Sequence, residues 1–206
     1  MNNSSFIISI SGPSGSGKST LVNELKKKLD EAVSFHFDDY VLSNTYPEDF
    51  SAWLKEGADP KQVLNPDFLK DLSNLANGGT IVLPHNKQEL KPDKYIIVEE
   101  PFGRGREGIG ELIDFAVCID IPLEVALARR ILRTLEGIQR SGSKADEPLK
   151  QMEEYLSQYL FVVRDLYHAI NTRVKSDCDL IVNGIKSPEL LAELIIVELK
   201  KRSLYV

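Results

Sequence analysis

The sequence predicts an α/β protein with a parallel sheet that is covered by helices on both faces. Along its 206 residues, short apolar runs alternate with longer stretches in which apolar residues recur at helical spacing. The apolar runs are nearly continuous, which is typical of strands buried on both faces of a sheet. The first run leads through a glycine-rich loop into a helix, so we expect a ligand site at the carboxyl ends of the strands.

Strands and helices can be placed along the whole chain by these patterns. The strands are predicted at residues 6–10, 33–37, 94–98, 115–121 and 180–182. Helices are predicted from about residue 20 and over residues 47–56, 66–77, 122–135, 148–174 and 188–201, with a loop around 141–143. Prolines open the helices at 47 and 66, and glycines 78 and 79 end the second of them. No repeat or low-complexity linker interrupts the pattern, which favours a single domain.

Composition excludes several classes of protein. With 42% hydrophobic residues the chain can bury a full core, while its net charge of −6 argues against a general nucleic-acid binder. Cys118 and Cys178 are too few to staple a domain of this size and indicate buried thiols in a reducing compartment. The amino terminus lacks the features of a signal peptide, and the apolar run 194–197 is too short to cross a bilayer. We therefore expect a cytoplasmic protein without a membrane or nucleic-acid partner, and a homo-oligomer is left open.

Residues 12–20, GPSGSGKST, fit the phosphate-binding pattern GxxxxGK[ST] and lie between a predicted strand and a predicted helix. Glycines let the backbone wrap around a polyphosphate, and the helix amino terminus adds positive potential. Lys18 is expected to reach the β- and γ-phosphates, and Ser19 to place its hydroxyl on Mg²⁺. The segment predicts binding of ATP and Mg²⁺. The residues expected to bind the nucleotide are Gly12, Ser14, Gly15, Ser16, Gly17, Lys18, Ser19 and Thr20.

Carboxylates follow two further strands, where a phosphate-transferring site needs them. Asp38 and Asp39 follow the second strand, and Glu99 and Glu100 follow the third. We predict that Asp38 is the general base and contributes to the metal site, and that Glu99 belongs to the metal shell, with Glu100 as its substitute. The alternatives are a turn or helix cap for the aspartates and a solvated carboxylate for Glu99.

Arginines gather after the fourth strand. Arg133 and Arg140 flank the expected break between two helices, where a mobile segment could close over ATP and stabilise the transferring phosphoryl group. Arg129 and Arg130 precede them on the same helix and are weaker candidates. In the loop after the third strand, Arg104 and Arg106 either meet the acceptor or belong to a surface turn. For the arginines from 129 to 140, the alternative is that two of them simply solvate the outer face of the helix.

These segments resemble the uridine kinase-like P-loop kinases, whose relatives include phosphoribulokinase, pantothenate kinase and nicotinamide riboside kinase. The resemblance implies a nucleotide kinase-like fold with a five-stranded parallel core and a short arginine-bearing lid. It also implies ATP-dependent phosphorylation of a hydroxyl on a small metabolite, with Asp38 as the base and Arg140 as the second lid arginine. We expect one kinase domain over 1–206, an acceptor-side excursion at about 40–92 and a lid at about 134–148. The similar segments are residues 12–20, 38–40, 121–133, 155–168 and 179–184.

Three functions remain open from the sequence. The first is a kinase for a nucleoside or nucleoside-like acceptor, the second a kinase for a non-nucleoside alcohol such as a vitamin precursor or sugar derivative, and the third a regulatory nucleotide switch. Residues 86–89 approximate the guanine-binding element of GTPases, but they precede the third strand, which disfavours the switch. Possible acceptor contacts are Tyr40, Trp53, His85 and Arg164.

Overall fold

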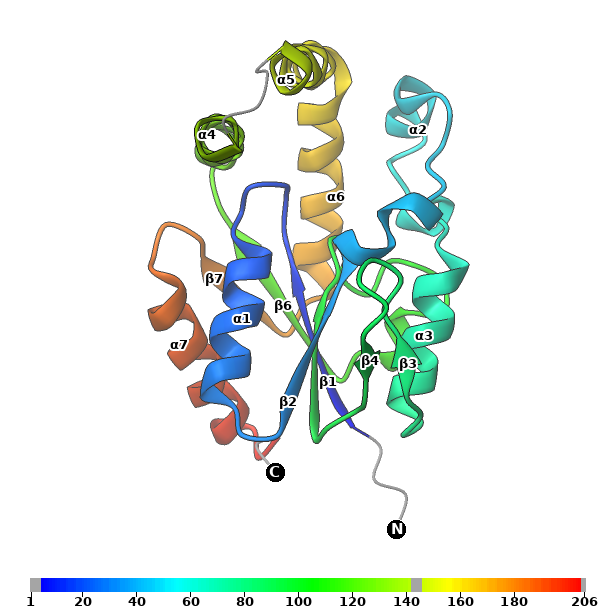
Figure 1. Cartoon of the computed structure of the whole chain (residues 1–206), viewed down its shortest axis with the longest axis vertical. Coiled ribbons are helices and arrows are strands. Elements are labelled where there is room, and N and C mark those ends of the chain that lie inside the picture. Colours follow the sequence, from blue (N-terminus) through cyan, green and yellow to red (C-terminus); the bar gives the residue numbers. More distant parts are fainter. Residues whose placement is uncertain (1–4, 142–145, 205–206) are drawn as a thin grey trace.

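The computed structural model describes residues 5–141 and 146–204. Its centre is a five-stranded sheet in the order β2-β5-β1-β6-β7, with every neighbouring pair parallel (Figure 1). This confirms the predicted α/β fold with a parallel core. The strands are β1 Phe6–Ser11, β2 Ala32–His36, β5 Tyr95–Glu99, β6 Phe115–Asp120 and β7 Leu180–Asn183.

Helices cover both faces of the sheet because alternate strand residues supply two separate apolar clusters. In β1, Ile8 and Ile10 pack with α1 and α7 in one cluster, whereas Ile7 joins α3 and α6 in the other. The helices α4 and α5 lie beyond the end toward which the strands run (Figure 1). The helices are α1 Lys18–Lys28, α2 Phe50–Lys55, α3 Pro66–Ala76, α4 Leu123–Ser141, α5 Asp146–Gln158, α6 Arg164–Asp177 and α7 Pro188–Lys201.

Two helix boundaries near the site differ from the prediction. The helix predicted over 47–56 begins only at Phe50, because the Asp49 carboxylate accepts hydrogen bonds from the backbone N–H groups of Ser51 and Ala52 and caps it there. The helix predicted to end near residue 135 continues to Ser141, since good helix formers surround Gly137.

The segment predicted as one helix over 148–174 has three parts. Helix α5 starts at Asp146, a π-helix spans Tyr159–Val163, and α6 follows directly. The π-helix turns Tyr159 and Val162 inward while Leu160 and Phe161 stay exposed. Most of the loop predicted at 141–143 lies outside the described residues.

The acceptor-side segment holds elements that apolar periodicity did not reveal. A 3-10 helix, Phe37–Ser43, follows β2 directly, so Asp38 lies in its first turn. A small antiparallel hairpin pairs β3, Ile81–Val82, with β4, Glu89–Leu90. These strands are too short to show an alternating pattern in the sequence. Among the residues that the structure describes, no helix has the length and apolarity needed to cross a membrane.

Candidate active site

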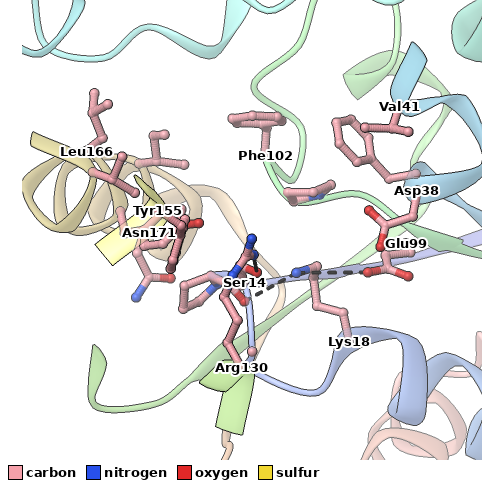
Figure 2. Close-up of a pocket in the computed structure, with 18 of the residues that line it drawn as sticks. Ser14, Lys18, Asp38, Val41, Glu99, Phe102, Arg130, Tyr155, Leu166 and Asn171 are labelled. Carbon is pink, nitrogen blue, oxygen red and sulfur yellow. Dashed lines mark hydrogen bonds and ion pairs between the residues drawn. The ribbon is translucent and has the colours of Figure 1, made fainter. Parts of the chain in front are cut away.

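A cavity of about 1240 Å³ opens at the carboxyl ends of the strands. The loop between β1 and α1 lines its floor, and helices α4, α5 and α6 line one side. The segments after β2 and β5 line the other side. The cavity therefore brings together residues that are spread along the sequence from Gly12 to Asn171. Figure 2 shows Asp38 and Glu99 across the cavity from Tyr155 and Asn171.

Glycine is required in the loop for two separate reasons. Gly15 has a φ of 85°, and a Cβ atom there would lie 2.1 Å from the carbonyl oxygen of Ala126 in α4. Gly17, the N-cap of α1, has a φ of 97° and open space around it. Glycine is therefore favoured there only by the left-handed backbone conformation, and not by lack of space for a side chain. The loop therefore packs tightly against α4 while it delivers Lys18 to the first turn of α1.

Most of the predicted loop residues line the cavity: Gly12, Ser14, Gly15, Gly17, Lys18, Ser19 and Thr20. Ser16 does not, because its side chain is buried; its backbone N–H donates to the Pro13 carbonyl oxygen at 3.1 Å. The Ser16 hydroxyl has no hydrogen-bond partner among the described residues. Ser16 therefore contributes to the conformation of the loop through its backbone hydrogen bond.

Lys18 presents a buried ammonium group to the cavity. Its Nζ donates to the Pro13 carbonyl oxygen at 3.2 Å and lies 3.9 Å from Oε1 of Glu99. Burial lowers the pKa of Lys18, and the charges of Glu99 and Asp38 oppose that change only in part. An ammonium has three N–H donors, so Lys18 retains donors that a phosphate could accept. The buried ammonium and the glycine cradle thus fit a polyphosphate.

Glu99 is an ionised carboxylate between Lys18 and His36. Its Oε2 lies 3.2 Å from Nδ1 of His36. Burial by itself raises the pKa of Glu99, but the hydrogen bond from His36, the charge of Lys18 and a hydrogen bond from Ser19 together bring the pKa below its usual value. Glu99 and Ser19 therefore offer two oxygen ligands beside the loop.

Glu100, the alternative to Glu99, is engaged elsewhere. Both of its carboxylate oxygens contact the buried guanidinium of Arg106, and Oε1 also accepts a hydrogen bond from the Phe102 backbone. That guanidinium lies over the rings of Phe37 and Phe68, at 5.0 and 4.8 Å from their centroids. This geometry favours Glu99 over Glu100 as the metal carboxylate and gives Arg106 a structural role.

Arg104 is also occupied in holding the fold together. Its guanidinium donates to Asp179 at 2.6 Å and to the backbone oxygens of Ile113, Asp114 and Asp177. It therefore joins the loop after β5 to the start of β7. Arg104 is not among the residues that line the cavity, and its contacts give it a structural role that neither of the two sequence-based alternatives described.

The two neighbouring aspartates point in different directions. Asp38 lines the cavity, whereas Asp39 lies 3.1 Å from Nδ1 of His85, which belongs to the turn between β3 and β4. Burial raises the pKa of Asp39 although His85 and His36 oppose that effect. Asp38 is therefore the aspartate in position to meet a substrate.

The four arginines of α4 separate into different environments. Arg133 lines the cavity, and its charge is one of the causes that lower the pKa of Lys18. Arg140, in the last turn, is exposed and pairs with Glu136 at 3.0 Å. Because α4 continues to Ser141, Arg140 is not in a loop as predicted, and the structure does not bring it to the cavity. Arg129 donates to the carbonyl oxygen of Gly184 at 3.0 Å.

Arg130 is a site residue that the sequence reasoning undervalued. Its guanidinium contacts the Ser14 hydroxyl in the phosphate loop and lies over the Tyr155 ring, 3.9 Å from the centroid (Figure 2). The signal was present in the spacing, since residues 130 and 133 share one face of a helix. His36 was also missed, because only the pairing of β2 with β5 places it at Glu99.

Apolar groups dominate the acceptor side of the cavity. Among the suggested acceptor contacts, Trp53 lines it, whereas Tyr40 is buried and donates to Asp71 at 2.7 Å. His85 is engaged with Asp39, and Arg164 is not part of the lining. The apolar and aromatic residues on this side are Phe37, Val41, Tyr46, Phe50, Trp53, Pro101 and Phe102, and Val163, Leu166 and Ile170 add apolar surface from the π-helix and α6 across the cavity.

No group of three or more His, Cys, Asp or Glu side chains is placed to hold a metal ion within residues 5–141 and 146–204. In phosphoryl-transfer sites Mg²⁺ is held through one or two carboxylates, water and the phosphates themselves. Ser19, Glu99 and Asp38 all line the cavity and are oxygen donors, so the donor set fits this mode of binding.

The chain is similar in sequence to proteins of known function. The family model described as "Phosphoribulokinase / Uridine kinase family" matches residues 7–190. A uridine kinase of Macrococcus caseolyticus is 29% identical over 188 residues, covering 85% of this chain and 86% of that protein. A uridine kinase of Staphylococcus aureus is 28% identical with the same coverage.

Solved structures that match this chain include a shikimate kinase from Aquifex aeolicus. It has a TM-score of 0.49 and 21% identity, covering 97% of this chain and 99% of that one. A possible uridine kinase from Bacillus stearothermophilus has a TM-score of 0.47 and 18% identity, covering 87% of this chain and 89% of that one.

Proposed function

The chain belongs to the phosphoribulokinase / uridine kinase family, and we propose that it transfers a phosphoryl group from ATP to a hydroxyl of a nucleoside or nucleoside-like acceptor. The glycine cradle and the buried ammonium of Lys18 support the donor half of this proposal. The apolar lining opposite them supports the acceptor half.

On the donor side, the loop from Gly12 to Thr20 binds the polyphosphate, and Lys18 neutralises the charge on its terminal groups. Ser19 and Glu99, with Asp38 nearby, hold Mg²⁺, which supplies charge neutralisation of the phosphate oxygens. Arg133 faces the same charge from α4. Arg140 could reach it only through movement of the carboxyl-terminal part of α4.

On the acceptor side, Asp38 accepts the proton of the attacking hydroxyl. It lies in the first turn after β2 and lines the cavity, and the part of the chain that the structure describes gives its carboxylate no hydrogen bond or ion pair. A carboxylate without a partner is free to orient and deprotonate an alcohol as the bond to phosphorus forms.

The observation that selects the acceptor is the placement of cations. The cations that line the described cavity are Lys18 in the phosphate loop and Arg129, Arg130 and Arg133 on α4. The nearby Arg106 is neutralised by Glu100. Opposite them, the aromatic rings of Tyr46 and Phe50 line the cavity and carry no charge. A phosphorylated or carboxylated alcohol would bury its anion unpaired there, whereas the ring of a nucleoside would not.

A coupled assay of ADP release tests the proposal with ATP, Mg²⁺ and a panel of acceptors. The panel contains nucleosides, nicotinamide riboside, pantothenate, sugar alcohols and a sugar phosphate. We expect nucleoside-dependent ADP release that the Lys18→Ala variant abolishes. Turnover confined to pantothenate or the sugar phosphate would refute the assignment of a nucleoside as the acceptor. ADP release that is independent of every acceptor would favour a regulatory nucleotide switch.

We propose one kinase domain over 1–206, in which about 40–92 forms the acceptor side and about 134–148 the lid. Limited proteolysis with and without ATP tests the lid, because closure should protect that segment. We propose the cytoplasm as the compartment, in keeping with two cysteines that form no disulfide.

A further inference from the structure

His36 and Glu99 form a cross-strand pair at the edge of the site. Each is the last residue of its strand, and the register of β2 on β5 makes them direct partners. Side chains opposite each other on adjacent strands share a face of the sheet. The neighbours of His36 in sequence, Phe35 and Phe37, belong to the apolar cluster on the other face, so alternation turns His36 toward the phosphate loop.

The contact between them has a defined direction. Nδ1 of His36 lies 3.2 Å from Oε2 of Glu99. A carboxylate that is ionised can only accept, so Nδ1 must carry the proton. The Glu99 side chain is only 5% exposed, and water therefore offers little competition for this oxygen.

The other oxygen of Glu99 is held at a distance from Lys18. Oε1 is 3.9 Å from the Lys18 ammonium, which instead donates to the Pro13 carbonyl oxygen at 3.2 Å. A closer approach would form a tight buried ion pair. Such a pair would consume the charge that Lys18 offers to phosphate and the oxygen that Glu99 offers to a metal.

We propose that His36 is a positioning residue that holds Glu99 by Oε2 and so keeps Oε1 available for Mg²⁺ and Lys18 available for phosphate. The inference rests on the proposed function only in assigning Glu99 to Mg²⁺. His36 itself is not among the residues that line the cavity. Without the N–H of His36, the Glu99 carboxylate turns toward Lys18 and pairs with it. The oxygen for Mg²⁺ and the ammonium for phosphate are then lost together.

Two amide substitutions at position 36 differ in whether they can donate a hydrogen bond to Glu99 from the position of Nδ1. The amide nitrogen of Asn lies close to the position of a histidine Nδ1, whereas that of Gln lies near Nε2. The His36→Asn variant should therefore keep the hydrogen bond to Glu99, and His36→Gln and His36→Ala should lose it. Thermal unfolding of each variant establishes that it is folded.

The measurement is calorimetric binding of ATP, without acceptor, in Mg²⁺ and in EDTA. The ratio of the two affinities reports the metal contribution. Because partners of metal ligands typically contribute 10–100-fold to metal affinity, we expect the ratio to fall about 10-fold in His36→Ala and His36→Gln. His36→Asn should retain it within about twofold.

A second set of variants asks whether His36 acts through Glu99. In a Glu99→Gln background, a further His36→Ala change should have no effect on the ratio, as expected for two members of one interaction. An unchanged ratio in His36→Ala, equal behaviour of the Asn and Gln variants, or additive effects in the double variant would each overturn the proposal. Because the binding assay needs no acceptor, failure of every acceptor in the ADP assay would refute the proposed function alone.

Discussion

Asp38 and Lys18 have separable roles at the scale of single residues. We expect Asp38→Asn to bind ATP normally but to lower kcat by roughly 10²-fold or more, the scale of general base catalysis. The amide preserves the size of the side chain and cannot take a proton. Calorimetry and the ADP assay measure the two properties on one preparation. Near-normal turnover would remove Asp38 from the proposed role.

Lys18→Ala should weaken ATP binding and abolish turnover together. The substitution removes a cation whose described contacts are the Pro13 carbonyl oxygen and the distant Glu99 carboxylate. Its loss removes from the phosphate loop a cation that the arginines of α4 do not replace at the same position. Lys27→Ala is a matched control, because Lys27 is an exposed lysine on the same helix and forms an ion pair with Glu24. Equal ATP affinity in the two variants would contradict the assignment of the loop.

Arg133 and Arg140 allow a direct comparison of a cavity-lining and an exposed arginine on one helix. We expect Arg133→Ala to lower kcat by about 100-fold with little change in thermal stability, as for loss of one donor to transition-state charge. Arg140→Ala should have a smaller effect, since its partner is the exposed Glu136. Equal losses of kcat would show that α4 moves over the cavity during turnover.

At the scale of elements, the contact between the phosphate loop and α4 depends on Gly15. Gly15→Ala should lower both thermal stability and ATP affinity, because the new Cβ would collide with the Ala126 carbonyl oxygen. Gly78→Ala is the control: its φ of 84° is nearly the same as that of Gly15, 85°, but it has open space around it. Gly78→Ala should therefore cost only about 1–2 kcal/mol of backbone strain and leave ATP binding intact.

If Gly15→Ala lowered thermal stability and ATP affinity no more than Gly78→Ala, the close packing of the phosphate loop on α4 would be contradicted.

Arg130 strengthens the same contact between the phosphate loop and α4. By touching Ser14 and lying over Tyr155, it connects the loop to α4 and α5. The prediction for Gly15 thus concerns the junction of these elements as well as one backbone position.

At the scale of the whole molecule, the buried pair of Glu100 and Arg106 anchors the loop after β5 among the aromatic residues of the core. Arg106→Ala should lower the free energy of unfolding by about 3–5 kcal/mol, because it leaves a buried carboxylate unpaired. Changing both residues, to Met and Leu, should cost less than the single change. Chemical denaturation measures both. Normal stability with a raised KM for the acceptor would instead place Arg106 at the substrate.

Much of the fold follows from local pattern, and the structure confirms it. The five strands are each within two residues of their predicted bounds because continuous apolar runs can be buried only inside the sheet. The boundaries of α2, α4 and α6 were wrong because capping by Asp49, tolerance of Gly137 and a π-helix depend on details that periodicity does not report. The hairpin of β3 and β4 left no pattern at all.

The sequence by itself determined the phosphate loop, the parallel sheet and the convergence of Asp38 and Glu99, since each follows from short-range spacing and from the rule that strand ends meet at one edge. Tertiary structure alone decided which side chains contact one another at the site. Strand register brought His36 to Glu99 across 63 positions of sequence. Packing buried Glu100 against Arg106 and left Arg140 in solvent. These choices depend on which distant side chains share one buried space, and that is settled only when the chain has folded.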